Sequence, residues 1–200
     1  MSRPTPWLVL LLGGASGVGK THVSYRLARH YGAGLTEVDD FQIVLEHMTT
    51  PEQQPVLHLW RTRPEETRRM TEEQHVAFSL EYARVMATAL EPVIANHIET
   101  RTRIVLEGDF ILPSLAVRPR YRDVEAGARV QAVFLYEDDE AQIRRNYLER
   151  EGEEQLLRAR VSWLVGDWLR REATRLGVPA VAARPWGTVL ERVIAAVDSR

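Results

Sequence analysis

The chain has 200 residues, with 28 acidic and 26 basic side chains and a formal net charge of −2. That length is typical of one domain with a sizeable core, and the lack of a basic excess argues against a general nucleic-acid binder. Because there is no cysteine, disulfides, zinc–thiolate sites and thiol catalysis are excluded. No apolar stretch approaches the ~20 residues of a membrane span, and Met1-Ser2-Arg3-Pro4 lacks signal-peptide architecture. We therefore expect a cytoplasmic protein without a membrane partner.

The first predicted strand covers residues 7–12, an apolar run typical of a buried parallel strand. A glycine-rich turn follows, and a helix is predicted over residues 20–31 because apolar side chains recur at every fourth position. The turn and the start of the helix match the phosphate-binding motif G-x-x-x-x-G-K-[ST] in the context that the motif requires. Its backbone amides would bind phosphates at a helix N-terminus. The residues expected to bind a nucleoside triphosphate are Gly14, Ala15, Ser16, Gly17, Val18, Gly19, Lys20 and Thr21.

Lys20 is the only lysine of the chain, and the other 25 basic side chains are arginines. Arg carries a wide planar fork, whereas Lys is a compact charge on a flexible stem that can pass between phosphates. The alternative, a chance glycine-rich turn before a helix, does not explain why lysine is kept only here. We also expect the Thr21 hydroxyl to bind Mg²⁺.

The second predicted strand, residues 35–38, is followed by Asp39 and Asp40. Phosphoryl transfer to a hydroxyl needs a group that orients the nucleophile and accepts its proton, and a carboxylate at the sheet edge can do both. Alternatively, one of the two caps a helix predicted over residues 41–48.

Residues 41–100 are predicted to form a helical excursion that binds the acceptor. The segment 49–71 is polar and punctuated by proline, and a long helix is predicted over residues 72–99 from an apolar stripe at helical spacing. Pro92 inside that helix predicts a kink or a break into two helices.

The third predicted strand, residues 103–107, ends in Glu107-Gly108-Asp109. A carboxylate at this position can hold a water of the Mg²⁺ shell, while the alternative is an ordinary solvated strand end. Asp39, Asp40, Glu107 and Asp109 together are the carboxylates that we expect near the substrate.

The remaining predicted strands cover residues 130–136 and 178–182, and helices are predicted over 139–150, 153–176 and 187–197. This alternation favours one α/β domain over residues 1–200, with a parallel sheet and helices on both faces. Arg144, Arg145 and Arg150 fall on the helix after the fourth strand, where Arg suits phosphate capture. Trp163 and Trp168 are interpreted as packing residues or as the surface of a possible homodimer.

The chain resembles the small P-loop kinases, the group that contains adenylate, shikimate and gluconate kinases, and within it the 2-phosphoglycerate kinase-like members. The resemblance covers nearly the whole chain and is carried by Gly13–Thr21, Arg103–Gly108, Ile111-Leu112-Pro113 and Phe134-Leu135-Tyr136. Val38-Asp39-Asp40 is similar to the Val-Asp-Ser of chloramphenicol phosphotransferase-like kinases, whose aspartate is the catalytic base.

The resemblance implies a five-stranded sheet in the order 2-3-1-4-5, with Asp39 as the base. It places Glu107, rather than Asp109, in the Mg²⁺ shell. It implies that Arg145 and Arg150, in an arginine-bearing lid region over residues 137–160, contact the nucleotide and the transferred phosphate, and that Arg184 borders the adenine. The lid differs from the longer family form, because Glu151–Glu154 predicts only a short turn.

These observations together predict an enzyme that moves the γ-phosphoryl group of ATP, with Mg²⁺, to a hydroxyl of a small molecule. One alternative is a nucleotide-dependent switch or regulatory ATPase without an acceptor, and the carboxylate after the second strand favours the kinase over it. A second alternative, an antibiotic-modifying phosphotransferase, has the same chemistry on a bulkier acceptor.

Overall fold

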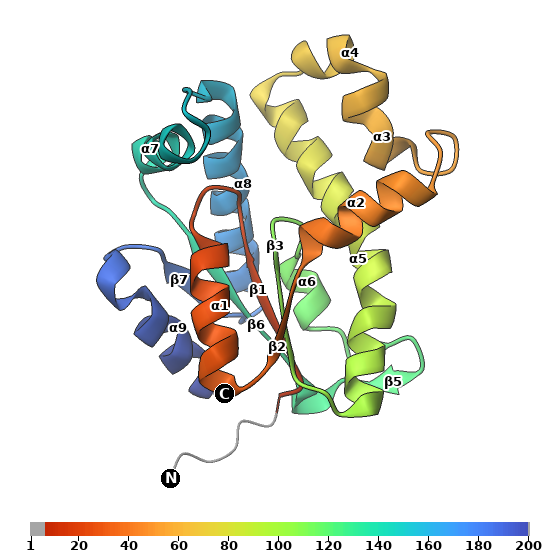
Figure 1. Cartoon of the computed structure of the whole chain (residues 1–200), viewed down its shortest axis with the longest axis vertical. Helices are drawn as coiled ribbons and strands as arrows, with labels where there is room; N and C mark the ends of the chain where they lie inside the picture. Colours follow the sequence, from red (N-terminus) through yellow and green to blue (C-terminus); the bar gives the residue numbers. More distant parts are fainter. Residues whose placement is uncertain (1–6, 200) are drawn as a thin grey trace.

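A parallel sheet of five strands runs through the computed structural model, which describes residues 7–199 (Figure 1). The strand order is β2-β3-β1-β6-β7, so the predicted α/β class and the order 2-3-1-4-5 of the main strands are confirmed. The segment Met1-Ser2-Arg3-Pro4 lies outside the described residues. The strands of this sheet are β1 (Val9–Gly14), β2 (Gly34–Glu37), β3 (Ile104–Gly108), β6 (Val130–Tyr136) and β7 (Ala180–Ala182).

Strand β1 lies at the centre of the sheet and is buried along its whole length. Its side chains alternate between the two faces, as the period of a strand requires. Val9 and Leu11 pack in a core with helices α5 (Glu72–Thr100) and α8 (Leu156–Arg175), whereas Leu10 and Leu12 pack with α1 (Lys20–Tyr31) and α9 (Val189–Asp198). Burying each of these side chains contributes about 1.5–3 kcal/mol to stability, so an apolar run on both faces holds the strand centrally.

The other helices are α2 (Val38–Met48), α3 (Pro55–Thr62), α4 (Pro64–Arg68), α6 (Pro113–Ala116) and α7 (Glu140–Glu151). Short 3₁₀ turns cover Gly127–Arg129 and Trp186–Thr188, and β4 (Arg120–Tyr121) pairs with β5 (Val124–Glu125) in a hairpin. Among residues 7–199, no helix is long and apolar enough to cross a membrane.

Three local predictions differ from the structure. Helix α2 begins at Val38, earlier than residue 41, so Asp39 and Asp40 lie inside its first turn, and neither is its N-cap, which is Glu37. The segment 49–71 contains α3 and α4, each started by a proline in its first turn, where the missing amide is not needed. Helix α5 continues through Pro92, so the predicted break is wrong; its axis bends along its length (Figure 1).

The turn between α7 and α8 is short, as predicted, while the lid role of residues 137–160 stays a prediction. Helix α7 ends at Glu151 with Gly152 in the left-handed conformation, and α8 begins at Leu156. Trp163 and Trp168 on α8 are half-buried, and the Trp163 indole donates a hydrogen bond of 3.0 Å to the carbonyl oxygen of Asp138. These contacts account for packing; the homodimer stays a prediction.

Candidate active site

The loop that is predicted to bind phosphates connects the end of β1 at Gly14 to the start of α1 at Lys20. Gly17 and Gly19 have φ angles of 81° and 89°, in the left-handed region that favours glycine. A Cβ on Gly14 would lie 2.4 Å from the carbonyl oxygen of Leu135, which leaves no room for a side chain. The loop therefore needs its glycines for backbone shape, and it presents the unpaired amides of the first turn of α1 to the cleft above it.

The Lys20 side chain is only 4% exposed and is held by three groups. Its Nζ donates to the Ala15 carbonyl oxygen at 2.9 Å and to Asp109 Oδ1 at 2.5 Å, and it lies 3.9 Å from Glu107 Oε1. Burial disfavours the charge, but the carboxylates of Asp109 and Glu107 outweigh it and hold the pKa of Lys20 above its ordinary value. The ammonium is therefore fully charged at neutral pH.

Thr21 and Glu107 lie together beside this lysine. The Thr21 hydroxyl donates a hydrogen bond of 3.0 Å to Glu107 Oε2. Burial raises the pKa of Glu107 to about 7 against the opposing effect of Lys20, and the neighbouring Asp109 and Glu37 add to the rise. Glu37 is the register partner of Glu107 across the β2–β3 ladder, which explains why the charge of Glu37 raises the pKa of Glu107.

These oxygen donors fit Mg²⁺. Within residues 7–199, no group of three or more His, Asp or Glu side chains is arranged to hold a metal ion by itself. Mg²⁺ in nucleotide sites, however, keeps several waters and takes only one or two protein ligands together with phosphate oxygens. A hydroxyl and a carboxylate 3.0 Å apart beside the phosphate loop supply that partial set.

Asp39 reaches the same cleft from the first turn of α2. The residue is exposed at the edge of the cleft, yet desolvation by the surrounding chain, followed by the charge of Asp109, raises the pKa of its carboxyl to about 6. A carboxylate with a pKa in this range is suited to accept a proton near neutral pH. Asp40 is exposed and does not line the cleft.

The cleft has a volume of about 840 Å³. Ten of the predicted site residues line it, drawn from the loop, the carboxylates and the arginines: Ser16, Gly17, Gly19, Lys20, Thr21, Asp39, Glu107, Asp109, Arg150 and Arg184. Trp186 also lines it, beside Arg184. The sequence analysis did not single out His22, Gln142, Asn146 and Glu149, which complete the wall.

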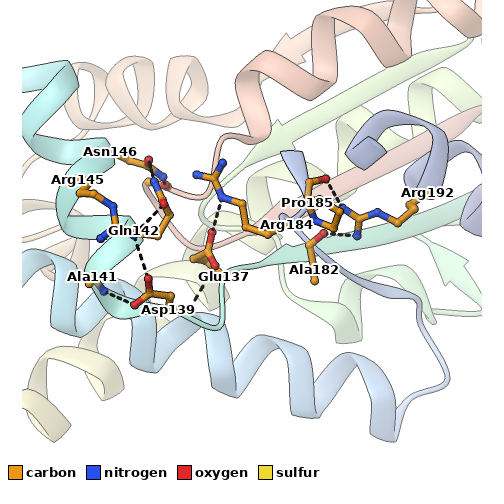
Figure 2. A network of polar contacts seen from close by, with 11 residues as sticks. Glu137, Asp139, Ala141, Gln142, Arg145, Asn146, Ala182, Arg184, Pro185 and Arg192 are labelled. Carbon is orange, nitrogen blue, oxygen red and sulfur yellow. Dashed lines mark hydrogen bonds and ion pairs between the residues drawn. The ribbon is translucent and has the colours of Figure 1, made fainter. Parts of the chain in front are cut away.

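The predicted arginines separate into two groups, and Figure 2 shows two of them, Arg145 and Arg184, with their partners. Arg184 lines the cleft and lies 3.2 Å from the buried Glu137 carboxylate, which fixes its direction. Arg150 also lines the cleft, from the last turn of α7. Arg145 does not: its guanidinium lies 3.0 Å from Asp139 and bonds Gln142 at 2.9 Å. In this conformation, only two of the three predicted arginines face the cleft.

Two side chains in the outer wall of the cleft contact the loop between β1 and α1. Asn146 on α7 donates a hydrogen bond of 2.7 Å to the carbonyl oxygen of Gly17. Trp186 packs against Gly19, where an added Cβ would lie 2.3 Å from the indole, and its ring centre is 5.6 Å from that of His22. A flat aromatic ring and a guanidinium beside a phosphate loop suit a purine base. No motif signals Gln142 or Asn146, because their role depends on how α7 meets the loop.

The sequence matches no protein-family model and no curated protein sequence. Three solved structures share the fold over nearly the whole chain. A gluconokinase from Sinorhizobium meliloti 1021 is 19% identical with a TM-score of 0.50, covering 98% of this chain and 94% of its own. A shikimate kinase from Aquifex aeolicus is 14% identical with a TM-score of 0.51 and covers 96% of each chain. A putative kinase from Chloroflexus aurantiacus is 13% identical with a TM-score of 0.51 and covers 98% of each chain. The fold is therefore that of structures described as small-molecule kinases.

Proposed function

We propose that the protein is an Mg²⁺- and ATP-dependent kinase that phosphorylates a hydroxyl of a small molecule. The observation that carries the proposal is the presence of Asp39 in the same cleft as Lys20 and the phosphate loop. A loop that only bound and slowly hydrolysed a nucleotide would not need a carboxylate of raised pKa in the same cleft. The gluconokinase and shikimate kinase that share this fold support the same class of reaction.

In this reaction, an acceptor oxygen forms a bond to the γ-phosphorus while the bond from that phosphorus to the β–γ bridging oxygen breaks and its electron pair leaves with ADP. Asp39 orients the hydroxyl and accepts its proton. Lys20 and the loop amides bind the oxygens that gain charge, and Arg150 approaches them from α7. Thr21 and Glu107 would hold Mg²⁺, which neutralises phosphate charge when bound.

The nucleotide lies along the loop toward the β6–β7 side of the sheet. Arg184 and Trp186 supply a guanidinium 5.4 Å from the centre of an indole ring, at the wall where a base would rest. Asp39, Glu107 and Asp109 lie on the β2–β3 side, so the acceptor enters from there. The helical excursion over residues 41–100 borders that side, which is why we keep it as the acceptor-binding segment.

The test is ADP release from Mg-ATP, measured with and without a library of alcohols, for the wild type and for the Asp39→Asn and Asp123→Asn variants. Asp123 is an exposed hairpin residue remote from the cleft and serves as the matched control. One acceptor that raises ADP release by orders of magnitude, with loss in Asp39→Asn only, supports the proposal. Slow release that no acceptor stimulates, despite tight ATP binding, would instead indicate a switch or regulatory ATPase. A bulky antibiotic as the sole acceptor would place the enzyme among antibiotic-modifying phosphotransferases.

A further inference from the structure

The ammonium that must bind phosphate is already paired. Lys20 Nζ lies 2.5 Å from Asp109 Oδ1, and the lysine is only 4% exposed, whereas the Asp109 side chain is 27% exposed. Of the three N–H donors of this ammonium, one binds the Ala15 carbonyl oxygen and one binds Asp109. An ATP β- or γ-phosphate that binds Lys20 competes with the Asp109 carboxylate and repels it, and so draws the ammonium away from Asp109. Asp109 is then left in a confined cleft without its cation, an arrangement that is costly unless another positive group replaces it.

The chain does not supply that replacement. Asp39 follows β2, and Glu107 and Asp109 stand at the end of β3, on one side of the central β1. The two arginines that line the cleft come from α7 and from the segment after β7, on the opposite side (Figure 1). Among the described residues that line the cleft, no arginine or lysine other than Lys20 belongs to the β2–β3 side.

The arginines of the excursion do not line the cleft. Arg61 lies 4.0 Å from Glu46, and Arg63 and Arg68 pair with Glu66 and Glu65. Arg69 and Arg84 are also absent from the cleft wall. When Lys20 binds the phosphates, the acceptor therefore faces the carboxylates of Asp39 and Asp109. One Mg²⁺ held at Thr21 and Glu107 would neutralise phosphate charge and not these two carboxylates. An acceptor that carries a carboxylate or a phosphate would enter this negative field without a basic partner and would be repelled.

A small compartment adjoins Asp109. It has a volume of about 90 Å³ and is mostly apolar, with Ser16, Leu80, Ala83 and Phe110 among its lining residues besides Asp109. Since one water occupies about 30 Å³ of liquid, the compartment suits a short carbon segment. A carboxylate next to an aromatic ring and aliphatic side chains is also a setting that favours an alkylammonium group over a free polyol.

We propose that the acceptor is a small alcohol that also carries an ammonium group, and that Asp109, released when Lys20 binds the nucleotide, pairs with that group. This inference rests on the proposed kinase function and adds the chemical class of its substrate. The hydroxyl lies toward Asp39, and the ammonium lies toward Asp109 at the mouth of the small compartment. Asp109 thus acts first as the resting partner of Lys20 and then as the residue that selects the acceptor.

The charge balance of the empty cleft supports this arrangement. Three carboxylates, those of Asp39, Glu107 and Asp109, line this side of the cleft, and both cleft-lining arginines lie on the other side. Negative charge is therefore already in excess on this side while Lys20 is still present. A cationic acceptor reduces the excess, and it also keeps Asp39 ionised so that this carboxylate can accept the hydroxyl proton.

The experiment measures kcat/KM for the full chain with Mg-ATP across matched sets of alcohols that share one carbon skeleton. Serinol, glycerol and glycerate form one set, and glucosamine, glucose and gluconate form another, extended by larger amino alcohols with their deaminated and carboxylate analogues. In the set with the highest turnover, we expect the amine to exceed the neutral alcohol at least about tenfold, the effect of one net ion pair of ~1.4 kcal/mol. A neutral or carboxylate member ahead of the amine would overturn the inference and leave the kinase standing. ATP binding without phosphorylation of any member would overturn the kinase proposal and this inference with it.

The Asp109→Asn variant tests whether Asp109 selects the acceptor or only supports the folded structure. It is expected to lose the amine preference, so that the ratio of kcat/KM for the amine to kcat/KM for the neutral alcohol falls to about one, whereas Asp123→Asn keeps the wild-type ratio. A second readout needs no acceptor: with the competing carboxylate removed, Asp109→Asn should bind Mg-ATP several-fold more tightly than the wild type. Weaker ATP binding by a folded Asp109→Asn protein would show that Asp109 supports the nucleotide rather than competing for Lys20, and would contradict the assignment.

Discussion

The Nδ2 atom of Asn146 lies 2.7 Å from the carbonyl oxygen of Gly17, so helix α7 is joined directly to the phosphate-binding loop. Gln142 bonds Asn146 one turn away at 2.8 Å and supports its orientation (Figure 2). Movement of α7, which carries Arg150, is therefore coupled to the loop that we propose binds the phosphates. A helix that is connected in this way and followed by a short turn can position Arg150 without a long mobile segment.

The first prediction concerns the two arginines of α7. We expect Arg150→Ala to lower kcat/KM about 10- to 100-fold, because a charge that faces the transferring phosphoryl is lost. Arg145→Ala should change it less than about threefold, since its partner is the exposed Asp139 at the start of the same helix. Steady-state kinetics with ATP as the varied substrate measure both. A larger loss in Arg145→Ala would mean that α7 rotates on binding and presents Arg145 instead.

The second prediction concerns the base. Asp39→Asn should lower kcat by about 10²- to 10⁴-fold, the usual contribution of a positioned general base, with ATP affinity retained. Asp123→Asn is the control for loss of a carboxylate at the surface. Near wild-type turnover in Asp39→Asn would show that proton transfer does not pass through this residue.

The third prediction concerns pH. Because Asp39 has a pKa raised to about 6 and must be ionised to accept a proton, kcat/KM should rise with pH, with a midpoint near that value, and then level off. The folded chain binds this proton more tightly than the unfolded chain, so the contribution of Asp39 to the free energy of unfolding falls as pH rises from 3.8 to about 6. Thermal unfolding should therefore show Asp39→Asn gaining stability relative to the wild type at about pH 8 compared with about pH 4. An equal difference at both values would contradict the raised pKa.

The fourth prediction concerns the only lysine. Lys20→Arg keeps the positive charge but changes the shape of the side chain. Lys20 is only 4% exposed, so its surroundings leave no room for the wider guanidinium. ATP affinity should fall about tenfold to a hundredfold, the effect of losing a charge-assisted hydrogen bond. Calorimetric titration with Mg-ATP measures this loss. Arg120→Lys, the reverse exchange in the exposed hairpin, should leave the affinity unchanged.

The fifth prediction compares two left-handed glycines. Gly19→Ala and Gly32→Ala both place a side chain at positive φ, at a cost of about 1–2 kcal/mol. At Gly32 nothing lies within 4 Å of the new Cβ, whereas at Gly19 it meets the Trp186 ring. Both variants should unfold more easily, but only Gly19→Ala should lose ATP affinity. Equal ATP affinity in the two variants would exclude a role for the Gly19–Trp186 contact in nucleotide binding.

The sheet and the phosphate loop could be predicted from the sequence because their signals are local. Apolar runs buried on both faces mark β1 and β6, and the glycines at 14, 17 and 19 are required by a backbone that no other residue adopts easily. The carboxylates at the ends of β2 and β3 could also be anticipated, since parallel strands bring their carboxyl ends to one edge.

Other parts of the site depend on contacts between distant segments. The pairing of Lys20 with Asp109 joins residues 89 positions apart, and the Asn146–Gly17 bond joins residues 129 positions apart. Neither leaves a pattern in the chain. The continuity of α5 through Pro92 has a related cause: its buried stripe, from Phe78 to Ile98, is held by tertiary packing that outweighs the local cost of proline. The closer likeness to 2-phosphoglycerate kinase-like or chloramphenicol phosphotransferase-like enzymes, the homodimer and the cytoplasmic location stay predictions.

The burial of Lys20 gives this protein an unusual chemical surface. The chain contains a single ε-amine, and that amine is 4% exposed and held between carboxylates. Acylating reagents that coat most proteins through lysine therefore find no side-chain target on the outside of this one. Acylation of Lys20 requires the ammonium to leave Asp109 and to lose its proton. The rate of labelling therefore measures how often the Lys20–Asp109 pair opens. A bound nucleotide should prevent the labelling.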